Sequence, residues 1–428
     1  MKKFKAGEGF ALEMDAKDPL KDYTQRFYKK EGQIYMDGNS LGLLSKDAEA
    51  SLLRILEEWK ILGINGWLEG DIPWFYYGEE LGKMMAPLVG AQADEVIITG
   101  STTVNLHNLT ATFFRPNGKK NKILADELNF PSDKYALDSQ LRLHNLNSDS
   151  HLILVRSRDG KTLDEDDIVA AMNENVALII LPAVLYRSGQ LLDIEYLTSK
   201  AHEKGILIGF DCSHSVGAVP HKFSQWEVDF AFWCNYKYMN NGPGGTAGIY
   251  VNKKHFNIDV GLAGWWGYQK DSQFDMKLDF RRAKAAGGWQ IGTINMLSTA
   301  PLEGSLKIYH EAGIENLREK SMTATEYLIF LMDELLPLEK YGFQIGTPRN
   351  PQRRGGHVAV EHEEALRINE ALKKRGVIPD FRYPNVIRLA PVPLYVSFHE
   401  IWQVVQHLKE IMDNQEYANF SDKSGPVA

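Results

Sequence analysis

Between residues 95 and 251, short apolar runs alternate with amphipathic stretches, and no other feature of this sequence restricts the fold as strongly. The apolar runs are short and nearly continuous, as is typical of buried strands, and they cover 95–98, 122–125, 152–155, 177–181 and 206–210. The stretches between them have helical spacing and cover 102–113, 132–143, 164–173 and 193–204. This alternation predicts an α/β fold with a mostly parallel sheet.

The pattern changes beyond about residue 297. Two long helical stretches are followed there by two short apolar runs that predict strands, at 298–313, 315–336, 356–360 and 385–389. A chain of 428 residues is also longer than one typical domain. We therefore expect a large α/β domain over 46–296, and a smaller α+β domain that combines 297–428 with the N-terminal segment 1–45.

Charge and cysteine content exclude several classes of function. With a formal net charge of -8, the chain offers no basic face for a phosphate backbone, so we expect no nucleic-acid partner and favour a small-molecule substrate. No run approaches the length of about 18 apolar residues that a membrane span needs, and the N-terminus is polar, so we expect no membrane association and no export. Two cysteines, Cys212 and Cys234, form no disulfide framework, which favours the cytoplasm.

Two residues at the ends of expected strands point to a specific cofactor. Asp211 follows the apolar run 206–210, at the edge of a parallel sheet where ligands bind. Lys237 ends a later aromatic and nearly uncharged run. Taken alone, such an aspartate is more often a helix N-cap or ion-pair partner, and a lysine usually lies on a solvated face. Together they match pyridoxal phosphate, which needs a carboxylate at its ring nitrogen and a lysine for a Schiff base.

The third requirement is a site for the phosphate group. Residues 100–105 (GSTTVN) stand between a strand and a helix, so the hydroxyls of Thr102 and Thr103 and free backbone N–H groups could meet a phosphate at the positive end of the helix dipole. Simple N-capping is the alternative, although capping needs only one hydroxyl.

A glycine-rich segment raises the possibility of a nicotinamide cofactor. Residues 242–247 (GPGGTA) formally match the dinucleotide fingerprint, but the chain continues as a strand where the fingerprint requires a helix. We expect these glycines instead to leave room for a cofactor beside Lys237. The histidines and cysteines lack metal-ligand spacing, so we expect no metal site.

Several longer motifs resemble the kynureninase family of pyridoxal-phosphate enzymes. They begin at residues 38 (GNSLG), 103 (TVNLH), 130 (FPSD), 211 (DCSHSVG), 233 (WCNYKY) and 389 (LAPVPLY). The resemblance runs from about residue 35 to 400 and implies the aminotransferase type I fold, with a mostly parallel seven-stranded sheet in the large domain. It also implies hydrolysis of the Cβ–Cγ bond of L-kynurenine to anthranilate and L-alanine, a step of tryptophan degradation, with pyridoxal 5'-phosphate as cofactor.

The resemblance further implies roles for individual residues. Lys237 would be the catalytic Schiff-base lysine, Tyr236 the acid that protonates Cβ, Asp211 the partner of the ring nitrogen and Phe130 the ring that stacks on the cofactor. The other cofactor-binding residues would be Thr102, Thr103, Ser132, Asp133 and His214, with Trp265 and Thr293 reaching in from the second subunit of a homodimer with shared active sites. Phe130 could otherwise be a plain core residue, an aromatic's commoner fate.

The substrate pocket is implied in the same way. Its residues would be Asn39, Trp67, Tyr268, Gly292, Thr293 and Arg388. Arg388 would bind the α-carboxylate with its planar fork, although a lone strand-end arginine is more often in a surface ion pair. Animal members of the family, which favour 3-hydroxykynurenine, carry His, His and Asn at the positions of Trp67, Tyr268 and Thr293. We therefore expect a preference for unsubstituted L-kynurenine, unless Trp67 merely packs a helix end.

Two other functions fit the cofactor and the fold. A cysteine desulfurase needs a mobile catalytic cysteine late in the chain, and no cysteine follows Cys234. A non-catalytic sensor on the same fold usually carries a DNA-binding module, which the acidic net charge argues against.

Overall fold

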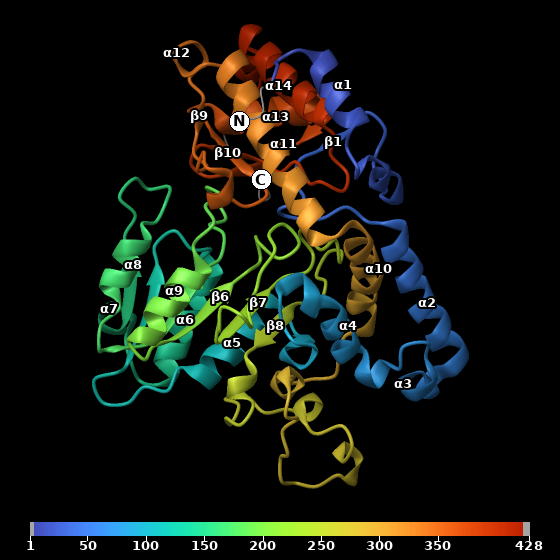
Figure 1. The fold of residues 1–428 in the computed structure, drawn as a ribbon, viewed down its shortest axis with the longest axis vertical. Coiled ribbons are helices and arrows are strands. Elements are labelled where there is room, and N and C mark those ends of the chain that lie inside the picture. Colours follow the sequence, from blue (N-terminus) through green and yellow to red (C-terminus); the bar gives the residue numbers. More distant parts are fainter. Residues whose placement is uncertain (1–3, 423–428) are drawn as a thin grey trace.

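A seven-stranded sheet forms the centre of the computed structural model, which describes residues 4–422 (Figure 1). The strand order is β2-β8-β7-β6-β5-β3-β4, and β8 alone runs antiparallel to its neighbours. The strands are β2 (Val96–Ile98), β3 (Lys122–Asp126), β4 (Leu152–Val155), β5 (Val176–Pro182), β6 (Leu207–Asp211), β7 (Phe230–Trp233) and β8 (Gly248–Val251). The five strands expected from the apolar runs are confirmed, and so is the mostly parallel α/β sheet.

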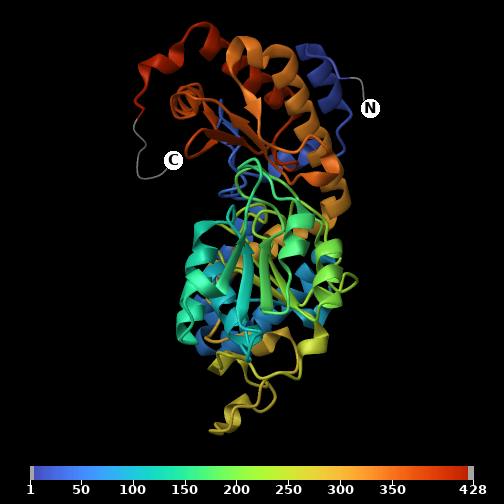
Figure 2. The same cartoon turned by 90° about the vertical axis from the view of Figure 1, so that its left-hand side faces the viewer.

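Helices cover both faces of this sheet (Figure 2). They include the four helices that the amphipathic stretches predict, and they are α5 (Thr102–Phe113), α6 (Pro131–Leu143), α7 (Ser148–His151), α8 (Glu165–Ala171) and α9 (Ile194–Glu203). Side chains alternate across the central strand β5 because successive residues of a strand point to opposite faces. Leu178 and Ile180 pack into the hydrophobic cluster under α5 and α6, whereas Ile179 and Leu181 join the larger core that contains α9.

A smaller antiparallel sheet lies beyond the carboxyl ends of the parallel strands (Figure 1). Its order is β12-β13-β10-β9, with β9 (Gln344–Ile345), β10 (Val358–Glu361), β12 (Asp380–Arg382) and β13 (Val386–Leu389). The helices of this part are α11 (Ile314–Leu335), α12 (Leu338–Tyr341), α13 (Ala365–Lys374) and α14 (Phe398–Asp413). The N-terminal segment joins it, because α1 (Glu8–Ala16) packs against α14 and β1 (Ile34–Tyr35) pairs in parallel with β11 (Val377–Ile378).

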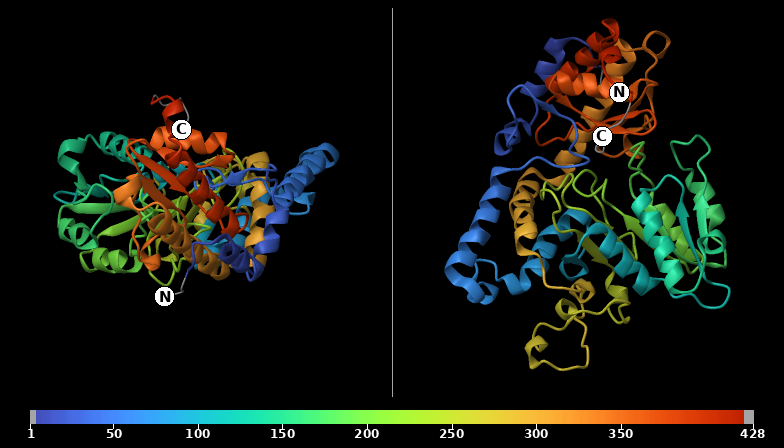
Figure 3. Two further views of the ribbon diagram at one scale, coloured as in Figure 1. Left: turned by 90° about the horizontal axis from the view of Figure 1, so that it is seen from above. Right: turned by 180° about the vertical axis from the view of Figure 1, so that it is seen from behind.

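Two long helices run side by side along one edge of the molecule (Figure 3). They are α2 (Lys46–Leu62) and α10 (Met296–Ala312), and α2 is followed by α3 (Gly66–Glu69) and α4 (Tyr77–Met85). The two backbones approach so closely that a Cβ on Gly304 would lie 2.1 Å from the carbonyl oxygen of Asp47. Because α10 packs against α2 and α4 as well as α11, it connects the two parts of the molecule, and the division at residues 46 and 296 stays a prediction.

Within residues 4–422, no helix is both long enough and apolar enough to cross a lipid bilayer.

Candidate active site

A cavity opens where the carboxyl ends of the parallel strands meet the small sheet. Its wall combines residues from the N-terminal segment, the loops after the strands of the large sheet, and β12 and β13: Asn39, Ser40, Thr102, Thr103, Asn129, Phe130, Ser132, Asp133, Pro182, Val184, Tyr186, Asp211, Ser213, His214, Tyr236, Lys237, Arg382 and Arg388. Eleven of the residues proposed from the sequence are among them. This is the edge of a parallel sheet where ligands bind.

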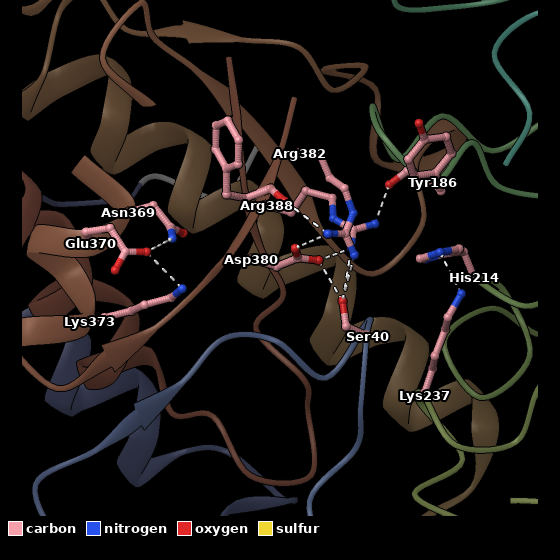
Figure 4. A network of polar contacts seen from close by, with 11 residues as sticks. Ser40, Tyr186, His214, Lys237, Asn369, Glu370, Lys373, Asp380, Arg382 and Arg388 are labelled. Atoms are coloured by element: carbon pink, nitrogen blue, oxygen red, sulfur yellow. Dashed lines mark hydrogen bonds and ion pairs between the residues drawn. The ribbon is translucent and has the colours of Figure 1, made fainter. Parts of the chain in front are cut away.

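Lys237 lies in a turn after β7, four residues beyond the strand's end at Trp233, and so does not close the strand as expected. Its Nζ lies 2.8 Å from Nε2 of His214, and both side chains are drawn in Figure 4. Burial, reinforced by the charge of Lys237, lowers the pKa of His214 well below its usual value, so the imidazole is neutral and accepts a hydrogen bond from the amine. The turn also contacts Gly42, where a Cβ would lie 2.4 Å from the Lys237 carbonyl oxygen.

Carboxyl groups gather on the large-domain side of the cavity. Asp211 ends β6, and its Oδ1 accepts a hydrogen bond of 2.8 Å from the backbone N–H of Ser213. Burial, together with the negative charges of Asp211 and Asp126, raises the pKa of Asp133 well above its usual value. Burial also raises the pKa of Asp126 to about 7. A cation in the cavity would favour the charged forms of Asp126 and Asp133.

The N-terminus of α5 reaches the same cavity. Gly100 adopts a left-handed conformation with φ of 60°, which turns the chain from β2 into the helix. Ser101 occupies the N-cap position, but its side chain makes no capping hydrogen bond within the part of the chain that the structure describes. Thr102 and Thr103 line the cavity, so simple N-capping does not account for this run of hydroxyls.

Phe130 is the residue immediately before α6, and its side chain is 45% exposed, which rules out a role as a plain core residue. Its ring lies edge-on to that of Tyr186, with centroids 5.3 Å apart. Tyr236, beside Lys237, is half-buried, and burial raises the pKa of its phenol, which keeps the phenol protonated at neutral pH.

Arg388 forms the small-domain side of the cavity and is fully buried, which excludes the surface ion pair considered above. Its Nη1 donates to the carbonyl oxygen of Tyr186 at 2.7 Å, and its Nη2 donates to Ser40 Oγ at 3.0 Å and to Asp380. The Arg388 Nε is buried with no partner among residues 4–422. The same holds for both polar atoms of the Asn39 side chain, so two lining residues still have hydrogen bonds to make.

The cavity contains residues that the sequence did not single out. They are Ser40, Asn129, Pro182, Val184, Tyr186, Ser213 and Arg382. Ser40 lies within one of the family-like motifs, and the spacing of Asp380 and Arg382 places both on one face of β12. The motif around Ser40 and the spacing of Asp380 and Arg382 could have been used to predict the small-domain side of the cavity from the sequence.

Five proposed residues lie away from this cavity. Trp67 packs against Trp74 and Trp266, with centroids 5.7 and 5.4 Å away, while Tyr268 is buried near Phe280. The others are on the surface, namely Trp265, Gly292 and Thr293. The glycines at 242–245 are absent from the lining too, among the residues described, so they do not make room beside Lys237 as we expected. They form a turn into β8, not a helix, which agrees with rejecting a dinucleotide site.

The polar groups of this cavity fit pyridoxal phosphate. A protonated pyridine nitrogen would supply the cation that the cluster of Asp211 and Asp133 lacks. The start of α5, with Thr102 and Thr103, would hold the phosphate group, and Lys237 would supply the amine for the Schiff base. Asp133 Oδ2 and His214 Nδ1 are buried without a hydrogen-bond partner within residues 4–422 and so remain available to a ligand.

Solved structures share this fold at low sequence identity. A cysteine desulfurase from Thermococcus onnurineus NA1 superimposes with a TM-score of 0.77 and 17% identity, covering 92% of this chain and 98% of that one. A mutant of the protein C-DES, with glycine covalently linked to its pyridoxal-phosphate cofactor, gives a TM-score of 0.78 at 16% identity, covering 90% and 98%. These similarities establish the fold.

Sequence relatives are much closer. A family model described as the kynureninase C-terminal domain matches residues 317–408. Kynureninase from Geobacillus thermodenitrificans is 59% identical over 419 residues, and kynureninase from Bacillus anthracis is 58% identical over the same length. Each alignment covers 98% of this chain and 97% of the relative. With this identity over nearly its whole length, and with an aspartate, a lysine and a buried arginine around one cavity, the chain belongs to the kynureninase family.

Proposed function

We propose that this protein hydrolyses the Cβ–Cγ bond of L-kynurenine to anthranilate and L-alanine with pyridoxal 5'-phosphate as cofactor. The observation that carries the proposal is the composition of one cavity. Lys237 and Asp211 lie on its large-domain side, and a buried arginine, Arg388, lies on its small-domain side. An amino-acid substrate has an amine, which would react with the cofactor held by the large-domain side, and a carboxylate, which Arg388 would bind on the small-domain side.

Lys237 moves the proton at the substrate Cα. When bound, pyridoxal phosphate withdraws electrons from the bonds at Cα. The Lys237 amine takes the Cα proton and returns it to Cα when L-alanine is formed, and neutral His214, at 2.8 Å, keeps the amine directed into the cavity. Water adds at the Cγ carbonyl, and the phenol of Tyr236, kept protonated by its raised pKa, gives a proton to Cβ as the bond breaks.

Arg388 and Asn39 bind the α-carboxylate of the substrate. Both are buried, and both carry N–H groups without a partner among the described residues. A carboxylate accepts two parallel hydrogen bonds from a guanidinium, and burial strengthens that pairing. Replacing Arg388 with lysine keeps the charge but removes the fork, so we expect kcat/KM for L-kynurenine to fall by about tenfold or more.

The active unit is a homodimer with shared active sites. An apolar surface runs over α2, α3 and the loop 262–280, where Trp67 contacts Trp266 and Phe75 contacts Phe274. Its exposed side chains include Leu53, Trp59, Ile61, Ile64, Leu68, Phe274, Met276 and Leu278. A patch of this kind marks an interface, and Trp265, Tyr268 and Thr293 lie in or next to this region of the chain, where they would meet the second subunit's cavity.

The location of the enzyme is the cytoplasm. Cys212 and Cys234 are both buried free thiols, as a reducing compartment allows.

Adding L-kynurenine to the protein loaded with pyridoxal phosphate tests the proposed activity directly. We expect anthranilate, followed by its fluorescence, and L-alanine in equal amounts. Lys237→Ala should abolish both, whereas Lys200→Ala, at a surface ion pair on α9, should retain them. If the loaded protein forms no anthranilate, the proposed function is wrong.

A further inference from the structure

Asp380 stands directly across from Arg388 in the small sheet. The antiparallel pairing of β12 with β13 places these two residues opposite each other. Cross-strand partners on one face of a sheet lie close enough for their side chains to interact. Both are 1% exposed, so their charges meet in a region without bulk water.

The Asp380 carboxylate contacts three polar side chains of the cavity wall, namely Ser40, Arg382 and Arg388 (Figure 4). Its Oδ2 accepts hydrogen bonds from Arg388 Nη2 and, at 2.6 Å, from Ser40 Oγ, while its Oδ1 lies 2.8 Å from Arg382 Nη1. Ser40 Oγ in turn accepts from Arg388 Nη2 at 3.0 Å. Asp380 does not line the cavity itself.

These contacts fix the orientation of the arginine. A guanidinium has five N–H donors. Asp380 and Ser40 accept from Nη2, and the Tyr186 carbonyl accepts from Nη1. The Nε–H has no partner among the described residues and remains for a ligand. A guanidinium held by three hydrogen bonds loses little freedom when a ligand binds, which is the advantage of a preorganised site.

We propose that Asp380 is a positioning residue, which holds the Arg388 guanidinium in the orientation that accepts the substrate α-carboxylate. The inference rests on the proposed role of Arg388. Without Asp380, buried Arg388 and half-buried Arg382 would repel each other, and Arg388 would lose the partner that sets its angle. A different role predicts the opposite result: if Asp380 merely competes with the substrate for Arg388, removing its charge strengthens binding.

The test compares L-kynurenine with the amine that it leaves on losing its α-carboxyl group, used as a competitive inhibitor. In Asp380→Asn we expect kcat/KM for L-kynurenine to fall about 10- to 100-fold, chiefly through KM. The inhibition constant of the amine should stay within about threefold, because it has no carboxylate to be oriented. Cofactor absorbance and affinity should not change.

The matched control is Glu370→Gln. It makes the same acid-to-amide change on α13, in a network with Asn369 and Lys373 that Figure 4 also shows and that lies outside the cavity. We expect no change for either compound. Equal losses for both compounds in Asp380→Asn, or tighter binding of L-kynurenine, would overturn the inference.

Two further variants separate the possible failures. If Asp380→Asn does not fold, Ser40→Ala tests the inference instead, because it removes one link between Asp380 and Arg388. We expect this variant to bind L-kynurenine several-fold more weakly and the amine with unchanged affinity. If Ser40→Ala affects neither compound, the inference is wrong. If Arg388→Lys affects the amine as much as L-kynurenine, the proposed role of Arg388 fails instead.

Discussion

Three aspartates, Asp126, Asp133 and Asp211, meet near one end of the cavity, but only Asp133 and Asp211 line it. Asp211→Asn keeps the size of the side chain and removes its charge. Removing one partner of a buried charge pair costs about 2 kcal/mol or more of binding free energy, so we expect cofactor affinity to fall. Turnover should also slow, even at saturating cofactor, because the ring nitrogen is no longer kept protonated. Titrating the cofactor absorbance and measuring kcat checks both effects.

Asp126→Asn is the control for this change, because it is the same substitution at a neighbouring carboxyl outside the cavity lining. We expect it to leave cofactor affinity near that of the unmodified protein. If Asp211→Asn behaves like Asp126→Asn, Asp211 has a structural role only.

At the scale of the elements, the segment between β6 and β7 carries a buried histidine. His221 Nε2 lies 2.9 Å from Ser215 Oγ, and its ring stacks on Phe223. Burial, with a smaller effect from the charge of Arg318, lowers the pKa of His221 from 6.5 to about 3. A depressed histidine pKa means that the unfolded chain binds more protons, so stability is present above pH 6.5 and is lost as the pH falls toward 3.

Replacing His221 with glutamine tests this pH dependence. The amide can keep the hydrogen bond to Ser215 but does not titrate. Between about pH 7.5 and about pH 5.0 the histidine should cost the folded protein about 2 kcal/mol, at about 1.4 kcal/mol per pH unit. Between these two pH values, the free energy of unfolding of His221→Gln should therefore fall by about 2 kcal/mol less than that of the unmodified protein. Urea titration at each pH measures both free energies. Parallel curves for the two proteins would contradict this.

At the scale of the whole molecule, the shared-site dimer predicts that two inactive variants restore one another. Lys237→Ala inactivates the cavity of its own subunit, and a Thr293 variant would damage only the cavity of its partner. Mixed dimers should therefore contain one intact site and recover activity, up to about a quarter of the unmodified level if the subunits mix at random. No recovery after confirmed subunit exchange would argue against shared sites.

The same assembly bears on substrate preference. Trp67 offers mainly an apolar face and Thr293 a short side chain, so a 3-hydroxyl group would lose hydrogen bonds to water without full replacement, at a cost of about 1 to 3 kcal/mol. We expect kcat/KM to favour L-kynurenine over 3-hydroxykynurenine by about tenfold or more. A ratio near one would instead support packing alone for Trp67, whose ring already contacts Trp74 and Trp266 within one subunit.

The sequence by itself determined the large sheet and the residues at its edge. Apolar periodicity is a local property, because burial of a strand is set by its own side chains, and it located the five predicted strands together with Asp211 and the helix start at Thr102. The aromatic, nearly uncharged run that precedes it located Lys237, and the longer motifs then identified the family. Local patterns were less accurate about loops: the strand before Lys237 ends at Trp233, and the glycines at 242–245 form a turn away from the cavity.

Only the tertiary structure decided how the two sides of the site meet. Ser40 and Arg388 are 348 positions apart, and the pairing of Asp380 with Arg388 depends on the register of a hairpin. No local pattern encodes the Ser40–Arg388 contact, because it forms only when the N-terminal segment packs beside the end of β13, where Asp37 pairs with Ala390. The free donors of Arg388 and Asn39 likewise become meaningful only once both residues are known to be buried.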